Sequence, residues 1–281
     1  MVLLKRNENS IIIRKEQIIF FEKAEKKLYY EVQGEGEPTL LFVHGWMGSG
    51  AVWRKQVPYF AEKNRVVTFD LTGYGQSAKP EGLSYTPEVW LDDLDALIDH
   101  LNLDKPILVG WSMGGAIGMA YSVSRPEALS KLVIVDGTPL LVAQPHIFEH
   151  SIPPETAEQL SGALQNDFSV GARGFVEMMF PEPDIEALKD EIHAITQQTT
   201  APIALESVGN AGSADLRPML DQIKIPTLIL HGESDGVCSP KEGQCLADMI
   251  PNTQIHTFPG KGHLPFMTDA GAFNERLAAF I

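Results

Sequence analysis

The stretch Gly110-Trp111-Ser112-Met113-Gly114 constrains the fold of this chain more than any other, because it joins a strand to a helix through a sharp turn. Pro106–Gly110 is a short apolar run typical of a buried strand. Met113–Tyr121 follows at once with a helical composition, and Pro126 limits this helix because residues before proline avoid helical backbone angles. Together with the G-x-S-x-G pattern, this context predicts a nucleophile elbow, in which a strained turn raises the serine hydroxyl above the sheet.

A second G-x-S-x-G match tests this interpretation. Gly232-Glu233-Ser234-Asp235-Gly236 also follows an apolar run, but the next helix signal comes only at Ser239-Pro240. A nucleophile at Ser234 would also leave no well-placed acid before a downstream histidine. We therefore predict that Ser112 is the nucleophile and that Ser234 is a loop residue.

Apolar strand-like runs alternate with helical patterns on both sides of the elbow. Such alternation predicts an α/β fold with a mainly parallel central sheet covered by helices on both faces. An antiparallel hairpin is expected to precede it, and residues 1–16 read as an extension. The predicted strands are Ile18–Phe21, Leu28–Val32, Thr39–Val43, Arg65–Asp70, Pro106–Gly110, Lys131–Asp136, Ile225–Leu230 and Thr253–Phe258, and the other predicted core helices are Val52–Lys63, one beginning at Thr86-Pro87, Ser239–Ile250 and Asp269–Ile281.

Two polar segments are expected to be structural. The glycine-rich turn Asp70–Ser77 lacks the third glycine and the following helix of a dinucleotide fingerprint, so we interpret it as a tight turn held by local hydrogen bonds. The helix after Thr86 carries a run of acidic residues that we expect to form a solvated face: Asp92, Asp93, Asp95 and Asp99.

On these motifs the chain resembles the serine α/β-hydrolase superfamily, and the resemblance covers most of the sequence. His231-Gly-Glu-Ser-Asp235 resembles the family's H-G-x-x-D loop, which implies that Asp235 is the acid of a catalytic triad. Asp136 stays open as an alternative, because some relatives carry the acid after the sixth strand. Of eight histidines, His263 alone follows the acid on a loop beyond a strand, whereas His256 lies inside that strand and is expected to pack. The order Ser112, Asp235, His263 is that of the superfamily.

The resemblance also implies an oxyanion hole. In this superfamily the His-Gly-x loop after the third strand supplies one backbone amide and the residue after the nucleophile supplies the other. The corresponding N–H groups here belong to Trp46, in His44-Gly45-Trp46, and to Met113. The sequence leaves open whether the Trp46 side chain lines the substrate pocket or only packs.

Between residues 139 and 215 the strand pattern stops, and helix-like runs take its place: Glu155–Leu164, Val170–Phe180 and Ile185–Thr196. This segment resembles the helical cap that many family members insert after the sixth strand. We therefore predict a core of residues 1–138 and 216–281 and a cap of residues 139–215. The cap holds 12 acidic and 2 basic residues, a net charge of −10. Apolar candidates for its underside are Phe148, Phe168, Phe175, Met178, Met179 and Phe180.

The bulk composition excludes several classes of partner. A formal charge of −15 argues against binding to nucleic acid or to anionic membrane surfaces. No run approaches 18 apolar residues, and Met1–Arg6 has no apolar core of the kind a signal peptide needs. Two cysteines, Cys238 and Cys245, are too few for a disulfide scaffold and favour reduced thiols in a cytoplasmic protein. The oligomeric state is not predicted.

One motif suggests a metal. His146-Ile-Phe-Glu149-His150 fits the H-x-x-E-H pattern of inverted zinc proteases. Such a site needs its first two ligands on one helix face, and the prolines at 145, 153 and 154 leave little room for a helix. We therefore expect no metal and no organic cofactor.

These features predict a serine hydrolase, with a carboxylic ester of small to medium size and no charge as the leading substrate. The acidic cap would repel anionic carriers such as acyl carrier protein and coenzyme A thioesters. Alternatives are a lactonase, a cofactor-free haloperoxidase-like side activity, and a C–C bond hydrolase, for which the cap offers only the cations Arg173 and Lys189. A non-enzymatic ligand-binding protein of the same fold is a further alternative.

Overall fold

The computed structural model describes residues 17–23, 26–144 and 150–281. Its described strands form one eight-stranded sheet in the order β1-β2-β4-β3-β5-β6-β7-β8. β3 to β8 pair in parallel, while β2 is antiparallel to β1 and to β4. The predicted parallel sheet and its antiparallel hairpin are thus confirmed. The strands are β1 Gln17–Lys23, β2 Lys26–Gln33, β3 Leu40–Val43, β4 Val66–Phe69, β5 Ile107–Trp111, β6 Lys131–Val135, β7 Thr227–Gly232 and β8 Thr253–Phe258.

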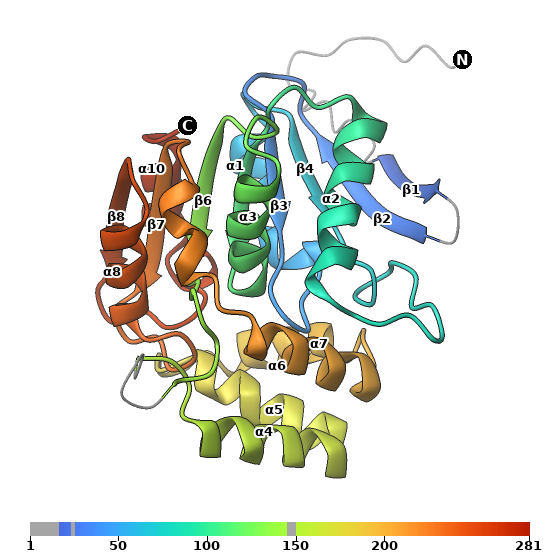
Figure 1. Cartoon of the computed structure of the whole chain (residues 1–281), viewed down its shortest axis with the longest axis vertical. Helices are drawn as coiled ribbons and strands as arrows, with labels where there is room; N and C mark the ends of the chain where they lie inside the picture. Colours follow the sequence, from blue (N-terminus) through green and yellow to red (C-terminus); the bar gives the residue numbers. More distant parts are fainter. Residues whose placement is uncertain (1–16, 24–25, 145–149) are drawn as a thin grey trace, which may run out of the picture.

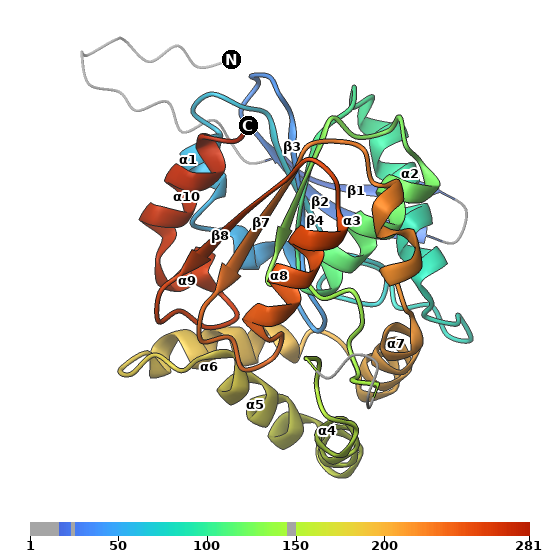
Figure 2. The same ribbon diagram turned by 60° about the vertical axis from the view of Figure 1, so that its left-hand side comes forward.

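Helices cover both faces of the sheet (Figures 1 and 2). One face carries α2 (Pro87–Leu101), α3 (Met113–Ser124) and α8 (Pro240–Met249). The other carries α1 (Val57–Phe60) and α10 (Ala270–Ala278), with α9 (Pro265–Thr268) beside α10. Every residue of β3, β4, β5 and β7 is buried, and most of these residues are apolar, as expected for parallel strands covered on both sides.

The predicted helix over Val52–Lys63 is wrong. Residues 50–60 instead form the 3-10 helix η1 (Gly50–Trp53) and the short helix α1, with a turn between them. Pro58 explains the break, because it has no N–H to donate to the carbonyl four residues earlier.

The acidic face expected on α2 is not uniformly solvated. Asp93 is fully buried. Its carboxylate accepts hydrogen bonds from the backbone N–H of Thr72 at 2.8 Å and from the Thr72 hydroxyl at 3.0 Å. Asp93 therefore anchors the glycine-rich turn 70–77 to the helix, and the charge run conceals one structural residue.

Four α-helices lie between β6 and β7 in the part of the chain that the structure describes, and we call them the cap helices: α4 (Pro154–Asn166), α5 (Phe168–Met179), α6 (Glu186–Thr196) and α7 (Ala201–Ser213). They lie below the carboxyl ends of the parallel strands in Figure 1. The sequence patterns had indicated the first three but not α7. The chain returns to the sheet through the 3-10 helix η2 (Arg217–Gln222).

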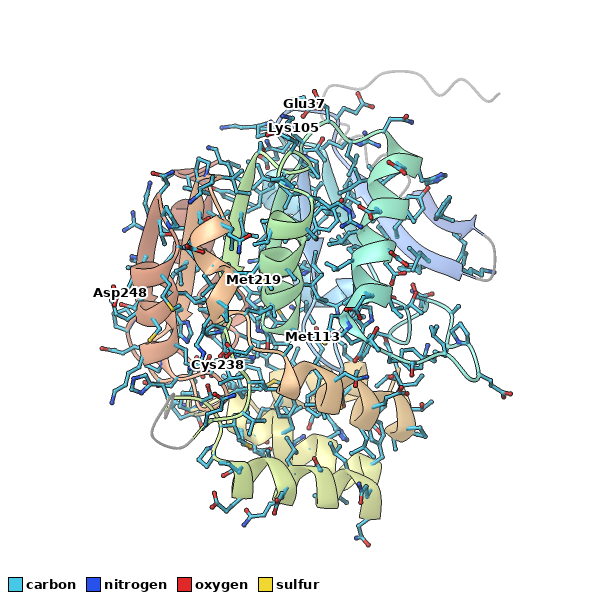
Figure 3. All side chains as sticks on the ribbon, viewed as in Figure 1. Glu37, Lys105, Met113, Met219, Cys238 and Asp248 are labelled. Atoms are coloured by element: carbon cyan, nitrogen blue, oxygen red, sulfur yellow. The ribbon has the colours of Figure 1, made fainter. Side chains whose placement is uncertain are left out.

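Figure 3 places Met113 and Cys238 at the end of the core that faces the cap helices, while Glu37 and Lys105 lie at the opposite end. Met113, the residue after Ser112, therefore lies where the core meets the cap helices. In the described part of the chain, no helix is both long enough and apolar enough to span a membrane.

Candidate active site

Ser112 occupies the turn between β5 and α3 with φ 53° and ψ −116°. A non-glycine residue at positive φ is strained, and surrounding contacts must hold it there. A Cβ at Gly110 would overlap the carbonyl of Gly114, and a Cβ at Gly114 would lie 2.5 Å from the carbonyl oxygen of Val43. The glycines of the motif are thus needed for close backbone approach, and the elbow geometry follows from the sequence.

His263 and Asp235 meet beside this turn although 28 residues separate them. The His263 Nδ1 lies 2.7 Å from Asp235 Oδ2, and both side chains are buried. The other oxygen, Oδ1, accepts hydrogen bonds from the backbone N–H groups of Val237 at 2.7 Å and Cys238 at 3.0 Å. Asp235 is therefore held by three N–H donors, two on Oδ1 and one on Oδ2.

The second ring nitrogen of His263, Nε2, is buried and has no hydrogen-bond partner among the described residues. With Nδ1–H donating to Asp235, Nε2 is the atom with a free lone pair. Trp111, the residue before Ser112, contacts the histidine in two ways. Its ring centroid lies 5.4 Å from that of His263, and its Nε1–H donates to the His263 carbonyl at 2.8 Å. The elbow and the histidine loop thus support each other directly.

The loop after β3 is held by a buried histidine. His44 Nδ1–H donates to the Gly45 carbonyl at 2.8 Å, and Nε2 accepts from the backbone N–H of Leu71 at 3.0 Å. Burial lowers the pKa of His44 to about 4, so the ring is neutral and keeps this donor and acceptor pair. These two hydrogen bonds fix the His44 ring between the loop after β3 and the glycine-rich turn 70–77.

The backbone N–H groups of Trp46 and Met113 form no hydrogen bond within the described residues. That of Met113 belongs to the first turn of α3, where N–H groups have no helical partner. The Trp46 side chain both packs and lines the pocket: its indole N–H donates to the Ala204 carbonyl at 3.0 Å, and its ring meets Phe175 edge-on at 4.8 Å. Trp46 therefore ties the loop after β3 to the cap helices.

The cap helices also touch the loops that carry the acid and the histidine. The backbone N–H of His263 donates to the Met179 carbonyl at 2.8 Å, and that of Gly262 donates to a carboxylate oxygen of Glu182 at 3.1 Å. A Cβ at Gly262 would overlap the Met179 carbonyl, and one at Gly236 would lie 2.6 Å from the Met178 carbonyl. The C-terminus of α5 is thus seated directly on both loops.

A cavity of about 100 Å³ opens beside Ser112, between α3 and the cap helices. Of the described residues that line it, none is ionisable. It is lined by Trp46, Pro87, Trp90, Ser112, Met113, Ala116, Ile117, Ala120, Thr138, Pro139, Leu140, Leu141, Ile152, Leu160, Phe175, Val208, Ala214, Leu216 and Val237. Of the residues predicted for the cap underside, Phe175 is in this lining, whereas Phe148 lies outside the described residues.

Asp136, the alternative acid, is also close to Asp235 and His263. It follows β6 with φ 47°, is fully buried, and accepts a hydrogen bond from the backbone N–H of Gly232 at 2.7 Å. One ligand atom each of Asp136, Asp235 and His263 lies within 4.8 Å of the others, close enough for one metal ion. Because Asp235 already binds three N–H donors, including that of His263, the cluster fits a hydrogen-bonded triad better than a metal site. The zinc motif falls largely on residues 145–149, outside the described residues.

The structure also shows where two other residues from the sequence analysis lie, Ser234 and His256. Ser234 is an exposed loop residue whose backbone N–H donates to the Lys261 carbonyl at 2.8 Å. His256, in β8, packs on Phe258 and lies 3.0 Å from the Arg276 guanidinium. Sequence reasoning missed Glu242 of α8, which is buried against the hydroxyls of Thr138 and Ser151. No sequence pattern marked it, because its partners lie about 100 residues away.

Comparisons with known proteins agree with this architecture. A family model described as the alpha/beta hydrolase fold matches residues 38–270. Over 263 residues the chain is 30% identical to a pimeloyl-(acyl-carrier protein) methyl ester esterase from Vibrio atlanticus (strain LGP32), covering 90% of this chain and 97% of that protein. A bromoperoxidase structure from Bacillus anthracis has a TM-score of 0.87 at 29% identity, covering 95% of this chain and 99% of that chain. An esterase structure from Exiguobacterium antarcticum is similar in fold, with a TM-score of 0.88 at 24% identity over 93% of this chain and 98% of that chain.

Proposed function

The chain belongs to the α/β-hydrolase family and is a carboxylesterase-type hydrolase, and we propose that Ser112, Asp235 and His263 are its catalytic triad. The observation that carries this proposal is the buried His263, which binds Asp235 through Nδ1 and keeps Nε2 unpaired beside the strained serine turn. A histidine oriented in this way can take a proton from one side only.

In the proposed reaction, His263 Nε2 takes the hydroxyl proton as Ser112 Oγ attacks the ester carbonyl. Asp235 stabilises the imidazolium that forms and holds the ring in place. The Trp46 and Met113 N–H groups donate to the oxyanion; loss of one such donor typically costs about 3–4 kcal/mol. The His263 imidazolium then protonates the leaving alcohol, and the C–O bond breaks to give the acyl-serine. Water, deprotonated by the same nitrogen, releases the carboxylic acid and restores Ser112.

The cavity supports an uncharged acyl group of medium length as substrate. Ser112, Ala116 and Ala120 repeat every four residues, are partly exposed, and line the cavity along one face of α3. At a rise of about 1.5 Å per residue, this stripe extends about 12 Å from the nucleophile. A charged substrate group would lose its water on this apolar wall and find no partner. Because that loss of hydration costs free energy, neutral acyl chains are favoured.

We propose that residues 139–215 form a cap that closes this cavity. Its two cations are already paired: Arg173 with Glu177, Glu186 and Asp190, and Lys189 with Glu177 and Glu186. The cap surface therefore offers an acidic carrier protein little attraction. This charge pattern supports a free ester over a carrier-bound one.

A second candidate is the methyl ester of an acyl chain carried by acyl carrier protein, the substrate in the name of the Vibrio relative. The similarity over 90% of the chain favours it. Turnover of such a carrier-bound ester with a kcat/KM at least tenfold above that of the matching free methyl ester would replace the free-ester proposal.

The triad is tested by hydrolysis of p-nitrophenyl esters, from acetate to decanoate, by the protein and by Ser112→Ala. We expect the variant to lose about 10⁴-fold or more in kcat. Ser234→Ala, which changes the serine of the second G-x-S-x-G match, is the matched control and should keep kcat/KM within about twofold. Equal losses in both variants, or activity in Ser112→Ala, would refute the assignment of the nucleophile.

A further inference from the structure

Two buried carboxyl groups lie side by side at the carboxyl end of the sheet, although the proposed mechanism uses only one. Asp136 directly follows β6, and Asp235 lies in the loop after the neighbouring strand β7. Their carboxylate oxygens come within 4.8 Å of each other and of a ring nitrogen of His263. Two like charges at this distance in a buried site strongly disfavour double ionisation.

The hydrogen bonds around the two groups differ. Asp235 accepts three N–H groups, from Val237, Cys238 and the His263 ring, and all three favour its ionised form. Asp136 accepts one, from the backbone N–H of Gly232 to Oδ1, and its buried Oδ2 accepts from no donor in the described residues. A protonated carboxyl group has one O–H donor, and Oδ2, which accepts no hydrogen bond from the described residues, is the oxygen available to carry that proton.

Among the described residues, the charged and titratable groups around Asp136 do not supply a cation to offset a second negative charge. From β7, His231 Nε2 lies 4.0 Å from Asp136 Oδ1 but donates to the Cys238 carbonyl at 2.9 Å, and burial lowers the pKa of this histidine, so its ring is neutral. The Cys238 thiol is neutral because burial raises its pKa. From the cap segment, Glu182 adds another acid.

Burial, followed by the nearby negative charge of Asp235, raises the pKa of Asp136 well above its usual range. This rise in pKa agrees with the hydrogen bonds, because only one N–H group among the described residues donates to Asp136. The two carboxyl groups then hold one proton, on Asp136, and one negative charge, on Asp235.

We propose that Asp136 is neutral at working pH and donates a hydrogen bond to Asp235, which makes Asp136 a positioning residue for the triad acid. The inference rests on the proposed triad. Asp136 holds the Asp235 carboxylate toward His263 and adds no second negative charge to the site. The left-handed backbone at Asp136 fits this role, because φ 47° is tolerated best by glycine, asparagine and aspartate.

The test compares Asp136→Asn, Asp136→Gly and Asp235→Asn through the pH dependence of kcat/KM on one p-nitrophenyl ester. Asparagine keeps a neutral donor at the same backbone angles, so kcat/KM should stay within about threefold and the midpoint of the acid limb within about 0.3 pH units. Glycine fits the backbone but removes the donor, so kcat/KM should fall about 10–100-fold with little change in KM. Asp235→Asn should lose about 10³–10⁴-fold, as an amide cannot stabilise the imidazolium.

Three results would overturn the inference while leaving Ser112 as nucleophile. A fall of one pH unit or more in the acid limb of Asp136→Asn would mean that Asp136 is ionised and charges the site. Unchanged kinetics in Asp136→Gly would mean that it has no positioning role. Loss in Asp136→Asn greater than in Asp235→Asn would make Asp136 the triad acid.

Infrared spectroscopy gives a readout that does not depend on the glycine variant folding. At pH 7 the wild type should show a buried carboxylic acid C=O band that Asp136→Asn lacks. Absence of any difference between the two spectra in this region would also refute a protonated Asp136. By contrast, failure of the triad itself would appear as activity in Ser112→Ala.

Discussion

Glu242 allows a quantitative test of how the core holds the loop that leads to the cap helices. Its side chain is buried in α8, where Oε1 lies 2.5 Å from the Thr138 hydroxyl and 2.6 Å from the Ser151 hydroxyl. Both hydroxyls also reach the Leu140 carbonyl. Glu242 leaves its buried Oε2 without a hydrogen-bond partner among the described residues. Burial raises its pKa from 4.5 to about 8, against the opposing effect of these hydrogen bonds.

Because burial raises the pKa of Glu242, the contribution of this group to stability decreases as pH rises. A carboxyl group whose pKa is higher in the native state stabilises the fold fully below its unfolded pKa, and the contribution is lost as pH rises through the native pKa. At about 1.4 kcal/mol per pKa unit, a rise from 4.5 to about 8 corresponds to about 5 kcal/mol lost between pH 4.5 and pH 8. At pH 7 the loss would be about 3 kcal/mol.

Glu242→Gln removes this titration, since the amide is neutral at every pH. Its NH₂ group would replace Oε2, which has no hydrogen-bond partner among the described residues, so an unsatisfied donor costs about 1–3 kcal/mol. We therefore expect the variant to be about 1–3 kcal/mol less stable than wild type at pH 5 and about 2–4 kcal/mol more stable at pH 8.5.

The assay is urea unfolding followed by circular dichroism at pH 5, 6, 7, 8 and 9. Glu158→Gln, at an exposed position of α4, is the matched control for loss of one negative charge and should follow wild type at each pH. A constant difference between Glu242→Gln and wild type over the whole range would refute the reasoning, because Glu242 would then not change its protonation on unfolding.

Three further predictions test the cavity, the contact between the cap helices and the histidine loop, and the absence of a metal. Ala120→Leu fills the far end of the stripe along α3, so kcat/KM should fall about tenfold or more on p-nitrophenyl decanoate and stay within about twofold on the acetate; equal effects on both would show that the acyl chain does not lie there. Gly262→Ala places a Cβ on the Met179 carbonyl and should lower kcat/KM about 10–100-fold. The control Gly271→Ala, in α10 with open space around it, should keep its activity and gain up to about 1 kcal/mol in unfolding free energy. Equal activity in the two variants would refute the role of this contact. Incubation with EDTA should leave ester hydrolysis unchanged, and a loss restored by one divalent ion would identify the cluster Asp136, Asp235 and His263 as a metal site.

The sequence predicted the elements that depend on local pattern. Strands and helices around Ser112 follow from apolar runs, glycines and prolines, and the strained turn at the serine is found where the motif indicated. It failed where local signals are ambiguous. The interval Val52–Lys63 looked like one helix, but a turn at residues 54–56, just before Pro58, breaks it. Asp93 looked solvated, although it binds Thr72.

What the sequence determined by itself was the strand–turn–helix at Ser112, the alternation that builds a parallel sheet, and the order of a serine, an acid and a histidine along the chain. Only the tertiary structure decided which acids share a site. Asp136 and Asp235 are 99 residues apart and become neighbours because β6 and β7 pair, with the cap helices inserted between them. The physical reason is that burial and charge pairing depend on contacts between distant segments, and local composition carries no record of those contacts.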